Sequence, residues 1–307
     1  MEIMDKKELG YTQPLFILAF DHRSSFKRGL LGIEKELSKD QEQEIADMKE
    51  VVYEGFKAAV NSGGIPKRVA ALLVDEQFGE KILEDAKKEG YCFALPVEKS
   101  GQKEFEFEYG QDFGDHIEKF KPDFVKALIR YNPEDNDETN LRQREKLKIL
   151  SDYCHDAGYK FLIEALIPPT EAQLAKTGGD KRRYDSRLRP ALAVRVVQEL
   201  LEAGIEPDVW KIEGMESAED YRKFIKIARS GGRSQVGVVI LGRGADNKQV
   251  EKWLAAGKKV KGVLGFAIGR TIFWEALSDL KAEKISRTQA VSQIGEQYYR
   301  FYNLFNS

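Results

Sequence analysis

The fold of this chain is decided by the stretch Asp208-Val209-Trp210-Lys211-Ile212-Glu213-Gly214. This short apolar run follows a turn at Pro207 and ends at a glycine, which is typical of a buried strand. Because side chains alternate along a strand, Lys211 and Glu213 share one face and Trp210 and Ile212 share the other. A buried charge without a partner is costly, so these charged side chains are expected to have a partner or a function.

Two other strand-like runs carry buried charges of the same kinds. Lys126 lies within the apolar run 123–129, and Glu164 ends the run 159–164. Two lysines and a glutamate in apolar strands are consistent with an active site. They are also consistent with a buried network of ion pairs that only holds the strands together.

The rest of the chain repeats the pattern of a strand followed by a helix. Eight apolar runs predict strands, at 15–20, 68–74, 92–95, 123–129, 159–165, 208–212, 235–241 and 260–267. Helical periodicity follows between them, at 38–60, 80–89, 113–120, 140–157, 190–203, 217–229 and 247–256. Strict alternation predicts a parallel sheet covered by helices. No Gly-x-Gly-x-x-Gly turn follows the first strand, so we predict one (β/α)8 TIM barrel over residues 1–307 rather than an open dinucleotide-binding sheet.

Composition and charge exclude several classes of partner. Hydrophobic residues make up 42% of the 307 residues, and the formal net charge is −2, so neither nucleic acid nor a membrane surface is expected to bind. The two cysteines have no metal-binding or disulfide spacing, and residues 1–11 have no apolar signal-peptide core. These features predict a cytoplasmic protein. The aromatic final helix, residues 298–305, is expected to pack on the barrel or on a second copy in a homo-oligomer.

In such barrels the active site lies at the carboxyl ends of the strands, so the polar residues found there are candidates. The candidates for substrate binding are Asp21, Arg23, Asp75, Arg130, Glu213 and, in the basic loop after the fifth strand, Arg183 and Arg187. That basic loop has a simpler interpretation as a solvated run of charge.

The loops after the seventh and eighth strands are the usual phosphate site of these barrels. They contain Gly242, Arg243 and Gly244 in the first loop and Gly269 and Arg270 in the second. The glycines would let the backbone approach an anion, and the arginines could add bidentate contacts. The alternative is that the glycines only form tight turns and the arginines pair with surface carboxylates.

The paired lysines indicate Schiff-base chemistry. A lysine nucleophile must be unprotonated near neutral pH, whereas the pKa of a free lysine is about 10.4. Burial and a second nearby cation both lower this pKa, so Lys126 and Lys211 could activate one another if they meet. Glu164 or Glu213 could then transfer protons.

Other chemistries make different demands on the sequence. Only His22 stands at a strand end, so a zinc site of several histidines is not expected, and no metal or other cofactor is predicted. A magnesium-dependent retro-aldol lyase using Asp21, Asp75, Glu164 or Glu213 remains open. A sugar-phosphate sensor without catalytic activity is a further alternative.

Five short motifs together carry a family resemblance. They are Phe-Asp21-His-Arg23, Leu-Leu-Val-Asp75, Val-Lys126, Glu164 and Trp-Lys211-Ile-Glu213. In these motifs, and over nearly its whole length, the chain resembles the tagatose-1,6-bisphosphate aldolase group of class I aldolases. It is most similar to the aldolase-like domain fused to the sugar kinase of bacterial myo-inositol catabolism (5-dehydro-2-deoxygluconate kinase). It has no Gly-Ala-Gly-Asp motif of the kinase.

The resemblance implies a role for each matching residue. Lys211 would form the Schiff base, Glu164 would act as acid and base, and Lys126 would contact the substrate. Arg270 and residues 242–244 would hold a phosphate. The implied substrate is a small phosphorylated sugar or keto acid, 5-dehydro-2-deoxygluconate 6-phosphate, cleaved to dihydroxyacetone phosphate and malonate semialdehyde.

Overall fold

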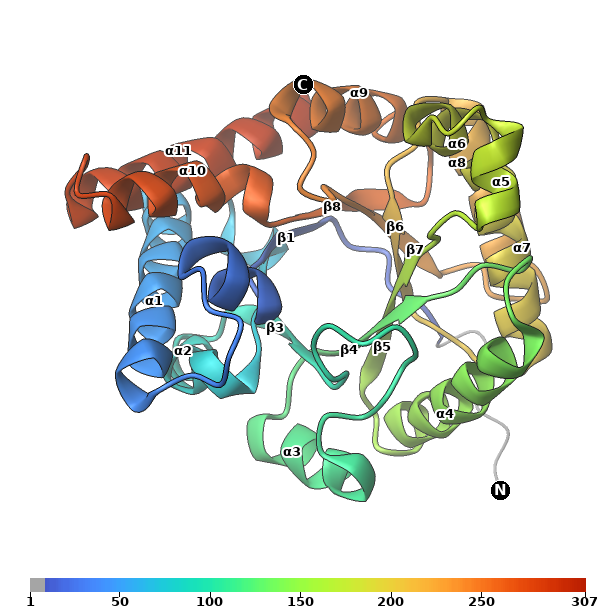
Figure 1. Cartoon of the computed structure of the whole chain (residues 1–307), viewed down its shortest axis with the longest axis horizontal. Coiled ribbons are helices and arrows are strands. Elements are labelled where there is room, and N and C mark those ends of the chain that lie inside the picture. Colours follow the sequence, from blue (N-terminus) through green and yellow to red (C-terminus); the bar gives the residue numbers. More distant parts are fainter. Residues whose placement is uncertain (1–8) are drawn as a thin grey trace.

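Eight parallel strands close into a barrel in which each strand pairs with the next and the last returns to the first (Figure 1). The computed structural model describes residues 9–307. The strands are β1 (Leu15–Ala19), β2 (Ala70–Leu73), β3 (Cys92–Pro96), β4 (Phe124–Arg130), β5 (Lys160–Leu166), β6 (Val209–Glu213), β7 (Gly237–Leu241) and β8 (Val263–Ile268). The predicted (β/α)8 barrel is therefore confirmed.

A ring of helices covers the outside of the barrel (Figure 1). The α-helices are α1 (Lys39–Asn61), α2 (Glu76–Glu89), α3 (Phe113–Phe120), α4 (Asp137–Asp156), α5 (Glu171–Lys176), α6 (Lys181–Arg187), α7 (Arg189–Glu202), α8 (Ala218–Ala228), α9 (Asn247–Gly257), α10 (Arg270–Lys281) and α11 (Arg287–Asn306). Three short turns of other helix types are η1 (Ser25–Leu30), η2 (Lys67–Val69) and η3 (Gly110–Asp112). The capping box predicted at Ser38 is present at the start of α1.

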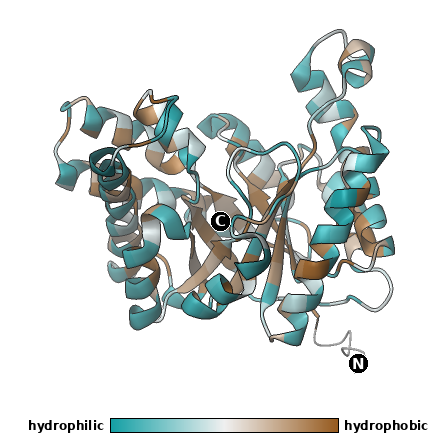
Figure 2. Cartoon of the chain, turned by 60° about the horizontal axis from the view of Figure 1, so that its bottom comes forward, coloured by the Kyte–Doolittle hydropathy of each residue, from teal (hydrophilic) through white to brown (hydrophobic). Residues whose placement is uncertain are grey.

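Strand alternation divides the apolar residues into two layers. Inward-facing residues such as Ile17, Leu73 and Val209 form a small cluster inside the barrel. Outward-facing residues such as Trp210 and Ile212 join the larger layer between strands and helices. Figure 2 shows the result, with hydrophobic strands inside helices whose outer surfaces are hydrophilic. The inner cluster closes the barrel interior, so the charged residues farther along each strand lie at its carboxyl end.

Two helix predictions needed correction. The second helix begins at Glu76 rather than residue 80, because the Asp75 carboxylate accepts a hydrogen bond from the Phe78 amide and caps it. The basic loop after the fifth strand is instead largely helical and forms α6. Here the Asp180 carboxylate accepts hydrogen bonds from the first amides of the helix. Because most residues of α6 are charged, its sequence lacks the apolar periodicity that would have predicted a helix.

The final helix, α11, packs on the barrel, which was one of the two predictions for it. In α11, Tyr298 donates a hydrogen bond of 2.6 Å to the carbonyl of Phe16 in β1. Tyr302 and Phe305 pack edge-on against the ring of Phe16. The formation of a homo-oligomer stays a prediction.

The predictions about membranes and the amino terminus have different outcomes. Over residues 9–307, no helix has both the length and the apolar character needed to cross a membrane. The sequence predicted no signal-peptide core in residues 1–11, and residues 1–8 of that segment lie outside the described residues.

Candidate active site

The barrel brings Lys126, Glu164 and Lys211 together from three adjacent strands. Glu164 pairs in register with Lys211 across β5 and β6, and Lys126 lies on the neighbouring strand β4. One carboxylate oxygen of Glu164 is 2.8 Å from the Lys211 Nζ and 3.0 Å from the Lys126 Nζ. All three side chains are buried. The two lysines therefore share one carboxylate, at the end of the barrel where active sites of this fold occur.

Lys126 lies at the centre of three carboxylates. Besides Glu164, it contacts Asp21 at 2.8 Å and Glu98 at 2.5 Å. Burial opposes the charged form of Lys126, but these carboxylates raise its pKa well above the usual value. Burial likewise opposes the charged form of Asp21, yet the two lysines hold the pKa of Asp21 well below its usual range. Lys126 is therefore a protonated, fixed cation.

Lys211 has a different environment. Its Nζ donates to Glu164, and among residues 9–307 no second carboxylate lies within ion-pair distance. Although burial raises it, the pKa of Glu164 is held below the usual value by the two lysine charges. Glu164 is thus an ionised acceptor between two ammonium groups. Lys126 has three carboxylate partners, whereas the one carboxylate partner of Lys211 within residues 9–307 is Glu164, which Lys126 shares.

Glu98 was absent from the sequence-based candidates. It follows β3 in the alternating series Ala94, Pro96, Glu98, so its direction into the barrel could have been inferred from spacing. Burial raises the pKa of Glu98, and Lys126 opposes that shift. The second oxygen of this carboxyl group, Oε2, is buried and has no hydrogen-bond partner within the described residues.

Three further buried atoms at this end of the barrel lack partners over residues 9–307, namely the Nδ1 of His22, the Nε of Arg23 and the Nε of Arg270. The His22 Nδ1 lies 4.0 Å from Asp21, beyond hydrogen-bond reach. Burial lowers the pKa of His22 to about 4, so the ring is neutral near pH 7. Buried polar atoms in native proteins are normally paired, so four unpaired polar atoms around one mouth suit a polar ligand.

The predicted phosphate loops differ in what their arginines do. Arg270 is the first residue of α10, and its guanidinium packs against Gly244 and donates to the Arg243 carbonyl at 3.3 Å. It has no carboxylate partner in the described part of the chain. Burial lowers its pKa, although Glu164 opposes this. Gly269 is required here, because a Cβ would lie 2.0 Å from the Ala19 carbonyl oxygen.

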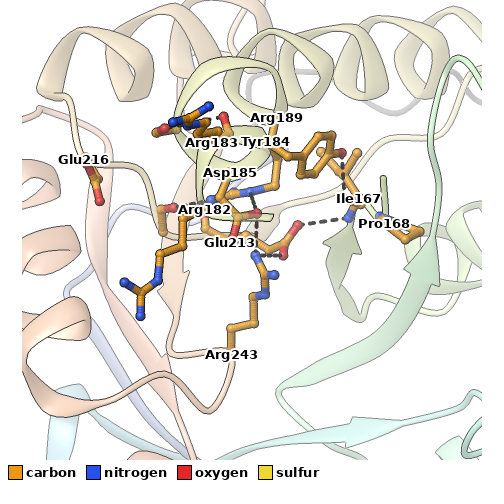
Figure 3. Close-up of polar contacts among 12 residues, drawn as sticks. Ile167, Pro168, Arg182, Arg183, Tyr184, Asp185, Arg189, Glu213, Glu216 and Arg243 are labelled. Atoms are coloured by element: carbon orange, nitrogen blue, oxygen red, sulfur yellow. Dashed lines mark hydrogen bonds and ion pairs between the residues drawn. The ribbon is translucent and has the colours of Figure 1, made fainter. Parts of the chain in front are cut away.

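Arg243 points elsewhere. Its guanidinium contacts Asp185 at 2.8 Å and Glu213 at 2.9 Å, as Figure 3 shows. The other oxygen of Glu213 accepts a hydrogen bond from the Ile167 amide. Burial raises the pKa of Glu213 in spite of its arginine neighbours. Arg243 and Glu213 are therefore occupied with one another, and only the backbone of Arg243 remains for an anion in the loop.

Several predicted substrate-binding residues are bonded to other parts of the protein. Asp75 is buried, contacts Lys49 with one oxygen and caps α2 with the other. Arg23 contacts Glu108 at 2.5 Å and the Glu98 carbonyl. Arg130 donates to the Gln102 carbonyl at 2.6 Å. Asp75 and Arg23 thus join the strand ends to neighbouring segments.

The remaining candidates lie apart from the lysines. Arg183 and Arg187 are exposed on α6, where Arg183 contacts Asp180 at 3.5 Å. The carboxylates of the magnesium alternative are also dispersed: Asp75 faces Lys49, Glu213 faces Arg243, and Asp21 and Glu164 face Lys126. Within the described residues, no three His, Cys, Asp or Glu side chains form a group that could hold a metal ion.

Comparisons with known proteins agree with this architecture. A family model described as "Uncharacterized protein conserved in bacteria (DUF2090)" matches residues 6–307. No curated protein matches the chain. The structure is similar to the crystal structure of Cgl0159 from Corynebacterium glutamicum, with a TM-score of 0.57 and 15% sequence identity, over 96% of this chain and 90% of that one.

It is also similar to the X-ray structure of the YdjI aldolase from Escherichia coli K12. The TM-score is 0.52 and the sequence identity 13%, over 84% of this chain and 88% of that one. At such identities the two similarities show the fold alone.

Proposed function

The chain belongs to the DUF2090 family, and from the geometry of its barrel mouth we propose that it is a class I aldolase that cleaves a phosphorylated keto sugar or keto acid. The observation that carries this proposal is the carboxylate of Glu164 shared by two buried lysines of unequal environment. A network whose only purpose was to hold strands together would not need unpaired buried polar atoms around it, and four such atoms are present, in His22, Arg23, Glu98 and Arg270.

Lys211 is the better candidate for the nucleophile. Three carboxylates keep Lys126 protonated, so its amine cannot attack a carbonyl. Lys211 has one carboxylate partner, and this acceptor is close enough to receive its proton at 2.8 Å. Lys126 then remains beside Glu164 as a fixed positive charge.

The proposed reaction uses these groups in order. Lys211 gives a proton to Glu164, and its Nζ adds to the ketone carbon of the substrate. The resulting carbinolamine takes this proton back from Glu164 and loses water to form an iminium ion, which leaves Glu164 ionised. Glu164 removes the proton of the substrate hydroxyl, the carbon–carbon bond breaks to release an aldehyde, and the electrons of that bond move into the iminium to form an enamine. Protonation of the enamine and hydrolysis by water release the ketone product and restore Lys211.

Arg270 and the loops around it are proposed to hold the phosphate of the substrate. A half-buried guanidinium without an ion-pair partner, at the amino terminus of α10, offers charge and donors to an anion. The backbone of residues 242–244 and Gly269 would complete the site. This use of Arg270 favours a phosphorylated substrate over a neutral sugar.

The substrate implied by the sequence resemblance, 5-dehydro-2-deoxygluconate 6-phosphate, meets these requirements. It contains a ketone for Lys211, a hydroxyl group for Glu164 and a phosphate for Arg270. Its cleavage would give dihydroxyacetone phosphate and malonate semialdehyde. The name of the YdjI aldolase, a protein of similar fold, adds support for aldol chemistry, and the phosphorylated metabolites involved favour a cytoplasmic location.

Borohydride trapping tests the mechanism directly. The protein is incubated with a panel of phosphorylated ketoses and keto acids, reduced with borohydride, digested and analysed by mass spectrometry. We expect a substrate-dependent adduct on the Lys211 peptide and activity that survives a chelator. An adduct on Lys126 would reverse the two roles.

Other outcomes identify the alternatives. Loss of activity with a chelator, without any adduct, would favour the magnesium-dependent lyase. Binding of the phosphorylated compounds without turnover or adduct would favour the sensor.

A further inference from the structure

A pocket of about 610 Å³ lies beside the carboxyl end of β6, and neither Lys126 nor Lys211 lines it. Its walls come from α6, from the turn after β6 and from the β7–α9 loop with the first turns of α9. Buried Arg189 and Trp253 line its inner side. The size is in the range of sites for small molecules. The functions proposed above share with it only the loop residues Arg243 and Gly244.

The pocket has an excess of positive charge. Its lining includes five basic side chains, Arg182, Arg189, Arg243, Lys248 and Lys252, and three acidic ones, Asp185, Glu216 and Asp246. The acidic groups are already bonded within the protein. Asp185 accepts from Arg189 and Arg243, Asp246 from the Gln249 amide and Glu216 from the Gln249 side chain.

Three of the basic groups, by contrast, have no side-chain partner among residues 9–307: Arg182, Lys248 and Lys252. Figure 3 shows Arg182 extending away from the cluster of Arg189, Asp185 and Glu213. Lys248 and Lys252 lie one turn apart on α9 and line the same pocket. These cations come from two separate helices, α6 and α9, and line one cavity, whereas the three acidic side chains of the lining already accept hydrogen bonds. The pocket therefore favours a ligand that carries several negative charges.

The pocket is contiguous with the proposed phosphate loop but is not the same site. Arg243 and Gly244 line it, and the Arg270 guanidinium packs against Gly244. Its inner side also touches the strand that carries Lys211, because Arg189 donates to the carbonyls of Glu213 and Gly214. A ligand here would therefore lie next to the catalytic strand without contacting Lys211.

We propose that this pocket is a second anion site, which binds a phosphate group through Arg182, Lys248 and Lys252. The phosphate could be the far end of a bisphosphorylated substrate, which links this site to the proposed function, or part of a separate small molecule. A guanidinium can make bidentate contacts with phosphate, and the two ammonium groups add point charges.

Calorimetry with inorganic pyrophosphate at constant ionic strength tests the site. The variant is Arg182→Gln/Lys248→Gln/Lys252→Gln, and the control is Lys35→Gln/Lys81→Gln/Lys88→Gln, which removes the same charge from exposed positions that do not line the pocket. We expect the variant to weaken one class of pyrophosphate sites at least about tenfold and the control to leave it unchanged. Equal melting temperatures show that both variants are folded.

Adding Arg270→Gln to the comparison separates the two sites. We expect Arg270→Gln to leave pyrophosphate binding in the pocket intact, whether or not the protein proves to be an aldolase. Unchanged binding in the triple variant would overturn the proposal, as would equal weakening in the control. Fructose 1,6-bisphosphate then serves as a second probe. If one molecule binds per chain and both the triple variant and Arg270→Gln weaken its binding, the substrate spans both sites. If two molecules bind per chain, the pocket takes a separate molecule.

Discussion

Glu164 and Lys211 are direct neighbours across β5 and β6, and the oxygen of Glu164 that accepts from Lys211 also contacts Lys126. A proton on Lys211 thus has an acceptor 2.8 Å away, while the charge of Lys126 beside it stays constant. This asymmetry gives the two lysines different expected phenotypes.

Replacement of Lys211 should remove chemistry, whereas replacement of Lys126 should remove stability. We expect Lys211→Met to abolish turnover and the borohydride adduct. We expect Lys126→Met to leave Asp21 and Glu98 without their cation and Glu164 with Lys211 alone, at a cost of roughly 3 to 5 kcal/mol in the free energy of unfolding. Urea unfolding of both variants measures this difference. A Lys126→Met protein as stable as the parent would contradict the assignment.

Glu98→Gln tests the residue that sequence analysis missed. Lys126 keeps Asp21 and Glu164 as partners, so we expect a near-parental melting temperature. The unpaired carboxyl oxygen becomes an amide or carbonyl group that cannot exchange a proton with the substrate, so kcat should fall about tenfold or more. Parental kcat would limit Glu98 to positioning Lys126. The pH profile of the variant is the second measurement.

Arg270→Ala should weaken phosphorylated ligands selectively. The lost charge-assisted contact is worth about 1.5 to 3 kcal/mol, or roughly a tenfold to a hundredfold change in affinity. Arg183→Ala, on exposed α6, removes the same charge away from the lysines and serves as the control. The measurement compares binding of a phosphorylated ketose with that of its dephosphorylated analogue. Similar losses for both compounds would contradict the phosphate assignment.

The neutral ring of His22 should make stability depend on pH. Its pKa falls from 6.5 to about 4 in the folded state because of burial, so the unfolded chain binds the extra proton first. Stability due to His22 is therefore complete above about pH 6.5 and decreases as the pH falls toward 4, by roughly 3 kcal/mol in total.

Because the pKa values of Glu98 and Glu213 are raised, these groups act in the opposite direction, so the comparison must isolate His22. Denaturant unfolding of His22→Gln and the parent protein at several pH values does so. Parallel curves between pH 4 and 6.5 would show that His22 is not responsible.

Asp75→Asn should affect stability rather than substrate binding. An asparagine can still accept the hydrogen bond from the Phe78 amide and cap α2. It cannot neutralise Lys49, which is fully buried and also donates to the Phe20 carbonyl. We expect a loss of about 3 kcal/mol or more in the free energy of unfolding, with KM unchanged. A raised KM at parental stability would return Asp75 to the substrate-binding set.

The convergence of Lys126, Glu164 and Lys211 could be predicted because it needs only strand alternation and closure of the barrel. The partner of Asp75 could not be predicted, because Lys49 lies inside the polar sequence of a helix and its burial depends on how α1 packs. The same holds for Arg243. Its partner Asp185 belongs to a helix that the charged sequence concealed, so its direction is set by tertiary contacts.

The hydrogen bond between Tyr298 and the Phe16 carbonyl has a consequence for how this protein is made. The bond joins positions 282 residues apart. One edge of β1 pairs with β2, and the other pairs with β8, which begins at Val263. Synthesis at about 5 to 20 residues per second leaves that apolar edge without its partner for on the order of tens of seconds on the ribosome. Nascent chains that stop before β8 and α11 should therefore aggregate through β1, even though every residue of the lysine site is already present in them.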